Sequence, residues 1–243
     1  MIKAIIFDFD NTLNNWDNIQ TDVEIHIVKK ISRKHKVNTK YLMDHLAEIR
    51  ARHYMDKSPK VAYNRELWFK ELFKHFKIKD NAKKIVEEYW DYGLKKVQAL
   101  PGSKTTLAAL KKKYKIGMLT DSDGEKRFKI HRIKKLGMYD YFDAIVPTDD
   151  VGFNKPHVRG FRYVLKKLGV KASECVMVGD HPEADLITAK KLGMKTVWTV
   201  HAFDRKGKYA YVDYRIHKIG QLLDIIKKLD KPVKNTKRKA KKS

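Results

Sequence analysis

The strongest constraint on the fold is an alternation of helical and extended segments between residues 101 and 229. Apolar residues at helical spacing predict helices, and short runs of apolar, β-branched residues predict strands. The predicted helices cover 103–113, 123–136, 157–168, 182–192 and 218–229, and the predicted strands cover 2–9, 115–120, 144–147, 174–179 and 195–200. Strands that alternate with helices pair in parallel and are covered by those helices. We therefore predict an α/β fold with a Rossmann-like parallel sheet as its core.

Residues 20–97 interrupt this alternation, because they show helical periodicity and no strand pattern. Breaks near Asn38, Pro59 and Asp80 divide the segment into about four helices. Apolar residues at helical spacing would give these helices a common core, as in a small bundle. We therefore expect an inserted helical-bundle domain. The expected division is an α/β core at 1–17 and 98–230, the helical insertion at 18–97, and a tail at 231–243.

The chain is strongly basic, with 54 Lys and Arg against 29 Asp and Glu, and a formal net charge of +25. Part of the excess lies at the end, in the segment KPVKNTKRKAKKS, which has almost nothing to bury and which we expect to be disordered. A positive field attracts anions of any kind. It is compatible with a phosphorylated metabolite and with a nonspecific association with nucleic acid, and it does not choose between them.

Cysteine content and hydropathy bear on the compartment. Cys175 is the one cysteine, which excludes a disulfide framework and a zinc site of several thiolates and favours a reducing compartment. No stretch approaches the ~20 apolar residues that a membrane helix needs. We expect a cytoplasmic protein with no membrane partner, and an inert thiol in an apolar strand.

Acidic residues follow two of the predicted strands. Asp8 and Asp10 end the first strand, and Asp180 follows the apolar run Val176–Gly179, with Asp185 five residues later. The carboxyl ends of parallel strands share one edge of the sheet, so these four carboxylates could converge on one hard cation with oxygen ligands. Mg²⁺ is the natural candidate.

Two further polar positions lie between these acidic sites. Thr120 ends the strand GMLT, and Lys155 lies in the rigid loop Asn154-Lys155-Pro156 before a helix. Each residue alone is weak evidence for a functional site, because a threonine after a strand is most often a helix cap and a lysine in a basic chain is most often at the surface. The order and spacing of all four sites are much more specific.

Taken together, these sites resemble the motifs of the haloacid dehalogenase superfamily over essentially residues 1–230. DFDNT matches its first motif, DxDx[TV]; LTDS matches the second; NKP supplies the lysine of the third; GDHPEAD matches the fourth, GDxxxxD. The resemblance is to the branch that carries a helical cap directly after the first motif, which is where the predicted helical insertion lies.

The resemblance implies a phosphatase mechanism and a role for each matching residue. Asp8 would be the nucleophile that forms an aspartyl phosphate, and Asp10 would be the general acid and then the base. Thr120 and Lys155 would stabilise the transferring phosphoryl group. Asp121 and Ser122, in the second-motif loop, would bind substrate together with Thr120 and Lys155.

The same resemblance implies the metal ligands. Mg²⁺ would be held by Asp8, the backbone carbonyl of Asp10, Asp180 and, directly or through water, Asp185. No other cofactor is implied. The presence of Asp10 favours phosphate ester hydrolysis over dehalogenation, because an alkoxide leaving group needs a proton and a halide does not.

Three hypotheses remain open on the sequence alone. The first is a magnesium-dependent phosphatase of a small phosphorylated metabolite; the second is a nucleic-acid phosphatase or binder, suggested by the charge; the third is a sugar-phosphate mutase that uses the same aspartyl phosphate.

Several residues of the sequence invite other interpretations. Asp121 and Asp123 in the second-motif loop could repel a phosphate, and we expect them to cap the following helix instead. Trp16, Trp68 and Trp90 lie at helical spacing, which is more typical of core residues than of a ring-binding site.

Overall fold

The computed structural model describes residues 1–56, 58–200 and 207–230. Within these ranges, six parallel strands form one sheet in the order β3-β2-β1-β4-β5-β6. The strands are β1 (Ala4–Phe7), β2 (Lys115–Thr120), β3 (Ala144–Pro147), β4 (Cys175–Gly179), β5 (Lys195–Thr199) and β6 (Tyr214–Ile216). The predicted Rossmann-like α/β core is confirmed. The edge strand β6 was not predicted, and the basic tail at 231–243 lies outside the described residues.

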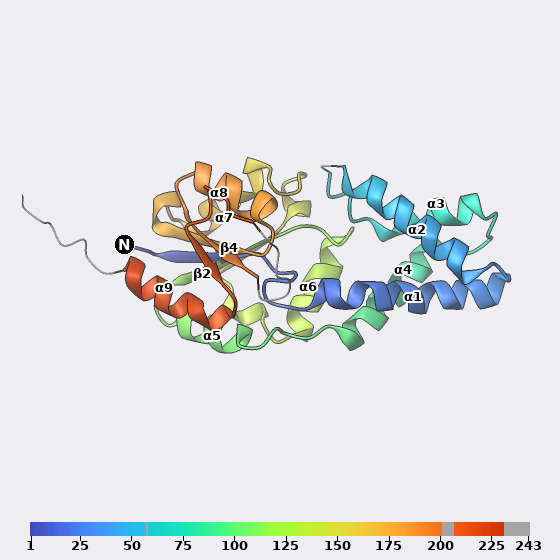
Figure 1. Ribbon diagram of the computed structural model, residues 1–243, viewed down its shortest axis with the longest axis horizontal. Helices are drawn as coiled ribbons and strands as arrows, with labels where there is room; N and C mark the ends of the chain where they lie inside the picture. Colours follow the sequence, from blue (N-terminus) through green and yellow to red (C-terminus); the bar gives the residue numbers. More distant parts are fainter. Residues whose placement is uncertain (57, 201–206, 231–243) are drawn as a thin grey trace, which may run out of the picture.

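The strand β1 lies in the middle of the sheet and is buried on both faces. Ile5 and Phe7 pack into one hydrophobic cluster, and Ala4 and Ile6 pack into a second. The first cluster includes residues of α5 (Ser103–Lys111) and α9 (Leu222–Leu229); the second includes residues of α7 (Val158–Leu168) and Ala189 of α8 (Ile187–Lys191). The sheet is thus covered on both sides (Figure 1), which explains why its strands read as continuous apolar runs.

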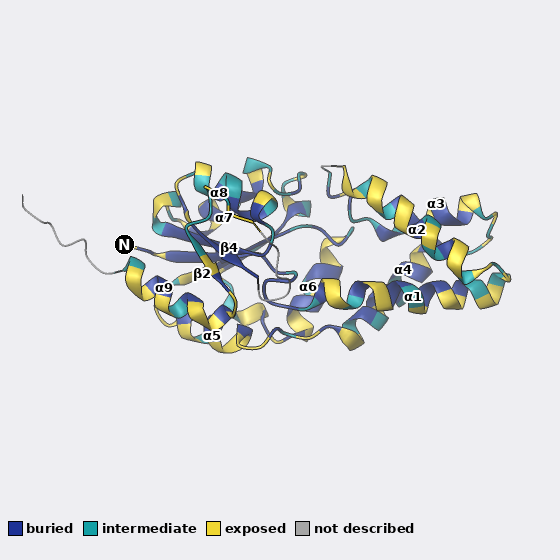
Figure 2. Cartoon of the chain, viewed as in Figure 1, coloured by how far each residue is buried: buried dark blue, intermediate teal, exposed yellow. Residues whose placement is uncertain are grey.

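Four helices follow the first strand and extend away from the sheet (Figure 1). They are α1 (Trp16–His35), α2 (Thr39–Tyr54), α3 (Arg65–His75) and α4 (Ala82–Lys96), and we call them the helical unit. Asparagine side chains cap three of them, because Asn38, Asn64 and Asn81 each accept a hydrogen bond from a backbone N–H of the first turn. The buried faces of these helices point toward one another and the exposed faces point outward (Figure 2).

Two linkers join the helical unit to the sheet, and they run side by side. Asn14 and Ala99 form an antiparallel bridge, and the backbone N–H of Leu100 donates to the carbonyl of Leu13. The Asn15 side chain accepts from the backbone N–H of Gln98 at 2.8 Å. The unit is therefore connected to the core through a short paired segment.

A helix of the α/β core also contacts the helical unit. In α6 (Lys126–Lys135), the Phe128 ring stacks on Trp90 of α4 with centroids 5.3 Å apart. Arg127 of the same helix pairs with Glu87 of α4. Residues of the helical unit and of the sheet consequently belong to one continuous hydrophobic cluster. The three tryptophans of the sequence analysis are buried in or next to it, as expected.

Among the described residues, no helix combines the length and the apolar character needed to cross a bilayer.

The Phe128 contact leads to a prediction about stability. Phe128→Ala should lower the free energy of unfolding by about 3 kcal/mol, because it leaves a cavity between α6 and α4. Tyr139→Ala is the control: Tyr139 is 40% exposed, and its loss should cost less than about 0.5 kcal/mol. Urea denaturation measures both, and equal losses would contradict the packing role of Phe128.

Candidate active site

The carboxyl edge of the sheet opens into a cavity of about 550 Å³. Asp8 follows β1, Thr120 ends β2 and Asp180 follows β4, so the sheet topology alone places them at this edge. All three line the cavity, together with Lys155 and Asp185. The residues that sequence reasoning assigned to four separate motifs thus meet in one place.

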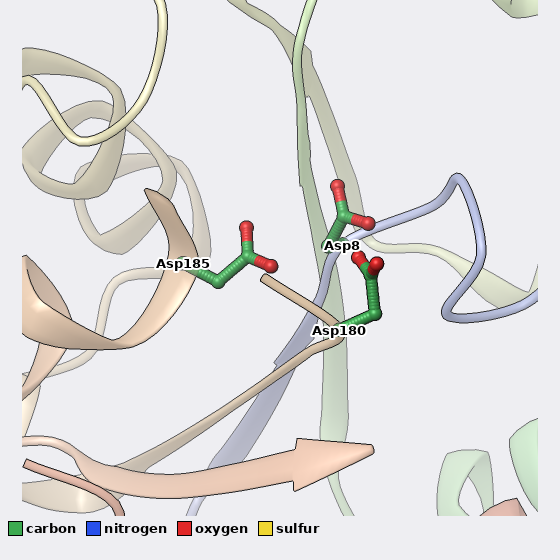
Figure 3. A group of neighbouring side chains, drawn as sticks. All are labelled: Asp8, Asp180 and Asp185. Atoms are coloured by element: carbon green, nitrogen blue, oxygen red, sulfur yellow. The ribbon is translucent and has the colours of Figure 1, made fainter. Parts of the chain in front are cut away.

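Three carboxylates form the centre of the site. Oxygen atoms of Asp8, Asp180 and Asp185 lie within 4.8 Å of one another, and all three residues are buried. Figure 3 shows the three groups turned toward a common point. Asp185 lies so close over the backbone that a Cβ on Gly179 would be 2.2 Å from its Oδ2. Glycine at the end of β4 is therefore needed for the approach of Asp185.

Lys155 supplies the positive charge among these carboxylates. Its Nζ donates to Asp8 Oδ1 and to Asp185 Oδ1, both at 2.6 Å. Burial alone would lower the pKa of Lys155, but the carboxylates of Asp185 and Asp8 raise it well above its ordinary value. The residue is therefore an ammonium ion. Its backbone N–H donates to Asp121 Oδ1 at 2.9 Å, which fixes the loop.

The surroundings of Asp8 raise the pKa of its carboxyl. Burial raises its pKa from 3.8 to about 6, and the charges of Asp185 and Asp10 act in the same direction, while Lys155 lowers it. Thr12 Oγ1 donates to Asp8 Oδ2 at 3.2 Å. In the metal-free protein, with Lys155 beside it, this carboxyl takes up a proton below about pH 6.

Asp10 has a different environment from Asp8, although the two lie only two residues apart. Arg132 donates to Asp10 Oδ1 at 2.7 Å and to Oδ2 at 2.9 Å, and the ammonium of Lys129 donates to Oδ2. Burial would raise the pKa of Asp10, but Arg132 and Lys129 hold it far below its usual range. Its carboxylate is not part of the group formed by Asp8, Asp180 and Asp185.

The sequence analysis missed Lys129 and Arg132. Both belong to α6, three residues apart and thus on one helix face, and both are almost completely buried. In a chain with 54 Lys and Arg, such a pair has no feature that separates it from surface residues. Their position on the helix directly after the second motif is the sequence feature that could have indicated that they lie near the site.

The expected capping by Asp121 and Asp123 is wrong. The N-cap of α6 is Glu125, which makes no side-chain cap hydrogen bond. Asp123 instead pairs with Arg132 at 2.8 Å and with Lys129 at 3.0 Å, because two buried cations beside the loop require counter-charges. Asp121 accepts from the Lys155 backbone, as described above.

The other two residues of the second motif line the cavity as well. Thr120 is 1% exposed and donates only a long hydrogen bond, 3.4 Å, to the Asp121 carbonyl. The Ser122 hydroxyl donates to Asp149 at 2.9 Å and accepts from the Gly124 N–H at 2.9 Å. Thr120 is therefore the more available of the two hydroxyls.

Residues of the helical unit complete the cavity, and no motif indicated them. They are Trp16, Asp17, Gln20, Tyr54 and Arg65, with Tyr63 from the segment before α3. The cavity consequently has one wall of motif residues at the sheet edge and one wall from the helical unit.

Comparison with known proteins identifies the family. The family model of the haloacid dehalogenase-like hydrolases matches residues 5–199. The chain belongs to this family. It is therefore a hydrolase, and the resemblance drawn from the four motifs is confirmed.

Relatives of this hydrolase include named phosphatases. A glyceraldehyde 3-phosphate phosphatase of Methanocaldococcus jannaschii is 32% identical over 95% of this chain and 100% of its own. A protein of the same name from Pyrococcus furiosus is 30% identical over 93% of this chain and 94% of its own. The crystal structure of a haloacid dehalogenase-type phosphatase from Thermococcus onnurineus superposes with a TM-score of 0.71 at 27% identity, covering 93% of this chain and 98% of that one.

The ion pairs of Arg132 lead to a prediction that compares two arginines of one helix. Arg132→Met should lower the free energy of unfolding by about 3 kcal/mol or more, because it leaves Asp10 and Asp123 without their main buried partner. Arg127→Met removes an exposed pair and should cost less than about 1 kcal/mol. Urea denaturation at pH 7 separates the two. Similar losses would mean that Arg132 does not stabilise the buried carboxylates.

Proposed function

We propose that this hydrolase removes phosphate from a small phosphorylated metabolite, through an aspartyl phosphate on Asp8 and with Mg²⁺ as its cofactor. The observation that carries the proposal is the group formed by Asp8, Asp180, Asp185 and Lys155: three buried carboxylates and one ammonium around a common point at the cavity wall. The phosphatase names of the relatives support the reaction class.

The side chains around this point fit a magnesium ion. Mg²⁺ prefers oxygen ligands, commonly one or two carboxylates with water. Asp8 and Asp180 would bind it directly. Asp185 accepts hydrogen bonds from Lys155 Nζ at 2.6 Å and from the His181 N–H at 3.0 Å. It would bind directly or through water, or orient its neighbours. When bound, Mg²⁺ would neutralise charge on the phosphoryl oxygens.

The proposed chemistry proceeds in two steps on Asp8. Its carboxylate attacks phosphorus, the bond to the ester oxygen breaks, and that oxygen leaves with a proton; water then attacks the aspartyl phosphate and releases inorganic phosphate. Lys155 offsets the charge of the nucleophile and of the phosphoryl group, and the Thr120 hydroxyl donates to a phosphoryl oxygen.

Asp10 is proposed as the group that exchanges protons with the leaving oxygen and with the attacking water. Its position at the cavity wall, next to Asp8 in sequence, supports this role. Its ion pairs with Arg132 and Lys129 favour the ionised form, which suits the base of the second step.

The substrate class that we propose is a small phosphate ester of about the size of glyceraldehyde 3-phosphate, on the basis of the relatives' names. A cavity of about 550 Å³ accommodates such a metabolite. In this proposal the helical unit acts as a cap, because it supplies the wall opposite the carboxylates and contains none of the four motifs.

The direct test is the replacement of the nucleophile. Asp8→Asn should abolish phosphate release from glyceraldehyde 3-phosphate, because an amide does not attack phosphorus; we expect a loss of at least about 10³-fold in kcat. Asp224→Asn, the same exchange at an exposed site, should have no effect. Assaying inorganic phosphate also distinguishes hydrolysis from a mutase reaction, which retains the phosphoryl group. Turnover of Asp8→Asn within tenfold of the parent would refute the assignment.

The raised pKa of Asp8 leads to a prediction about metal binding. Below about pH 6 the carboxyl is protonated in the metal-free protein, so Mg²⁺ must displace a proton. The apparent dissociation constant for Mg²⁺ should thus rise about tenfold from pH 7 to pH 5 and change little from pH 7 to pH 8. Isothermal titration calorimetry measures it directly. A constant affinity across this range would show that Asp8 is not a ligand.

A further inference from the structure

Arg65 is a buried cation that the proposed chemistry does not use. It begins α3, lines the cavity and is 2% exposed. Its guanidinium lies between two indole rings, 4.7 Å from the centroid of Trp68 and 4.9 Å from that of Trp90. These contacts fix the plane of the guanidinium at the cavity wall.

The hydrogen bonds of Arg65 are incomplete. One terminal nitrogen donates to the Tyr63 carbonyl at 2.8 Å, while Nε is buried and has no partner among the described residues. Within the described part of the chain, no carboxylate lies at ion-pair distance. The polar groups that act on the charge of Arg65 are the phenols of Tyr89 and Tyr54 and, after them, Asp123, which is already paired with Arg132 and Lys129. A buried guanidinium without a counter-ion is costly, and arginines in this state are typical of anion-binding sites.

Other hydrogen-bond donors lie on the same wall. Tyr54 and Tyr63 also line the cavity, with ring centroids 5.2 Å apart. Loss of hydration around the phenol groups raises the pKa of both, and the charge of Asp121 adds to the effect on Tyr63, so both carry their proton at neutral pH; Tyr54 as a whole residue is 40% exposed. The Tyr54 oxygen accepts from Gln20 Nε2 at 3.2 Å, which leaves its O–H to donate to a ligand. The acidic residues that line the cavity include Asp17 at the start of α1 and Asp121, whose charge acts on Tyr63.

We infer that Arg65, with Tyr54 and Tyr63, binds a second oxyanion on the substrate, at the end away from the transferred phosphate. This inference rests on the proposed function and narrows its substrate class. The favoured substrate is a phosphate monoester that also bears a carboxylate or a second phosphate, so glyceraldehyde 3-phosphate, which bears neither, should be the weaker substrate. The shared chemistry is a planar or tetrahedral oxyanion that a guanidinium binds with charge-assisted hydrogen bonds.

Pairs of substrates that differ only at the far end test the inference. 3-Phosphoglycerate and glycerol 3-phosphate differ in a carboxylate, and ribulose 1,5-bisphosphate and ribulose 5-phosphate differ in a second phosphate. The measured quantity is the ratio of kcat/KM within each pair. In one pair, we expect the native protein to favour the substrate with two oxyanionic groups by at least tenfold in kcat/KM. The pair that shows this preference identifies which oxyanion is bound.

Variants of one helix then assign the preference to Arg65. Arg65→Met should lower that ratio by about 30-fold, mainly through KM, and Arg65→Lys should retain part of it. Lys70→Met removes a charge from an exposed residue of α3 and should leave the ratio unchanged. An unchanged ratio in Arg65→Met, together with a lower melting temperature, would mean that Arg65 only stabilises the aromatic cluster, and the inference would be wrong.

A binding measurement separates this inference from the proposed reaction. In Asp8→Asn, titration with 3-phosphoglycerate or ribulose 1,5-bisphosphate should change the fluorescence of the tryptophans that flank Arg65. Glycerol 3-phosphate or ribulose 5-phosphate, which has one oxyanionic group, should bind with a dissociation constant at least tenfold higher. Absence of phosphate release by the native protein would overturn the proposed function alone. Equal binding of both members of each pair would overturn the inference alone.

Discussion

The site depends on the burial of one ammonium among carboxylates at the carboxyl edge of the sheet. Lys155 contacts Asp8 after β1 and Asp185 after β4, and its backbone is held by Asp121 after β2. The loop that carries it is also tied to the end of β3, where Thr148 donates to Asn154 at 2.8 Å. Since each of these charges would be strongly unfavourable alone in a buried position, the ends of β1, β2 and β4 have to stay together.

A second group of buried charges connects this edge to the helical unit. Arg132 of α6 pairs with Asp10 and Asp123 on the core side, and its guanidinium lies 4.3 Å from the ring centroid of Trp16 in α1. Phe128 makes the apolar contact one helical turn earlier. A single helix therefore sets the distance between the motif wall of the cavity and the wall that the helical unit provides.

The residues at strand ends were predictable because topology fixes them: a parallel sheet brings the ends of β1, β2 and β4 to one edge whatever the details of packing. The edge strand β6 was missed because three residues, Tyr214–Ile216, are too few to show a period. Arg65 and Arg132 were missed for a different reason. Their function comes from contacts with side chains distant in sequence, and nothing local separates a buried arginine from an exposed one.

The first motif shows how such distant contacts assign chemistry. Asp8 and Asp10 belong to one short segment, yet burial raises the pKa of the first to about 6 while two cations of α6 keep the second ionised. A general acid must hold a proton before it donates one. The proposed first step therefore requires Asp10 to release part of its pairing with Lys129 and Arg132 when substrate binds. Because α6 carries both cations and the aromatic contact with α4, the groups that set the ionisation of Asp10 and a contact that holds the helical unit lie on one helix.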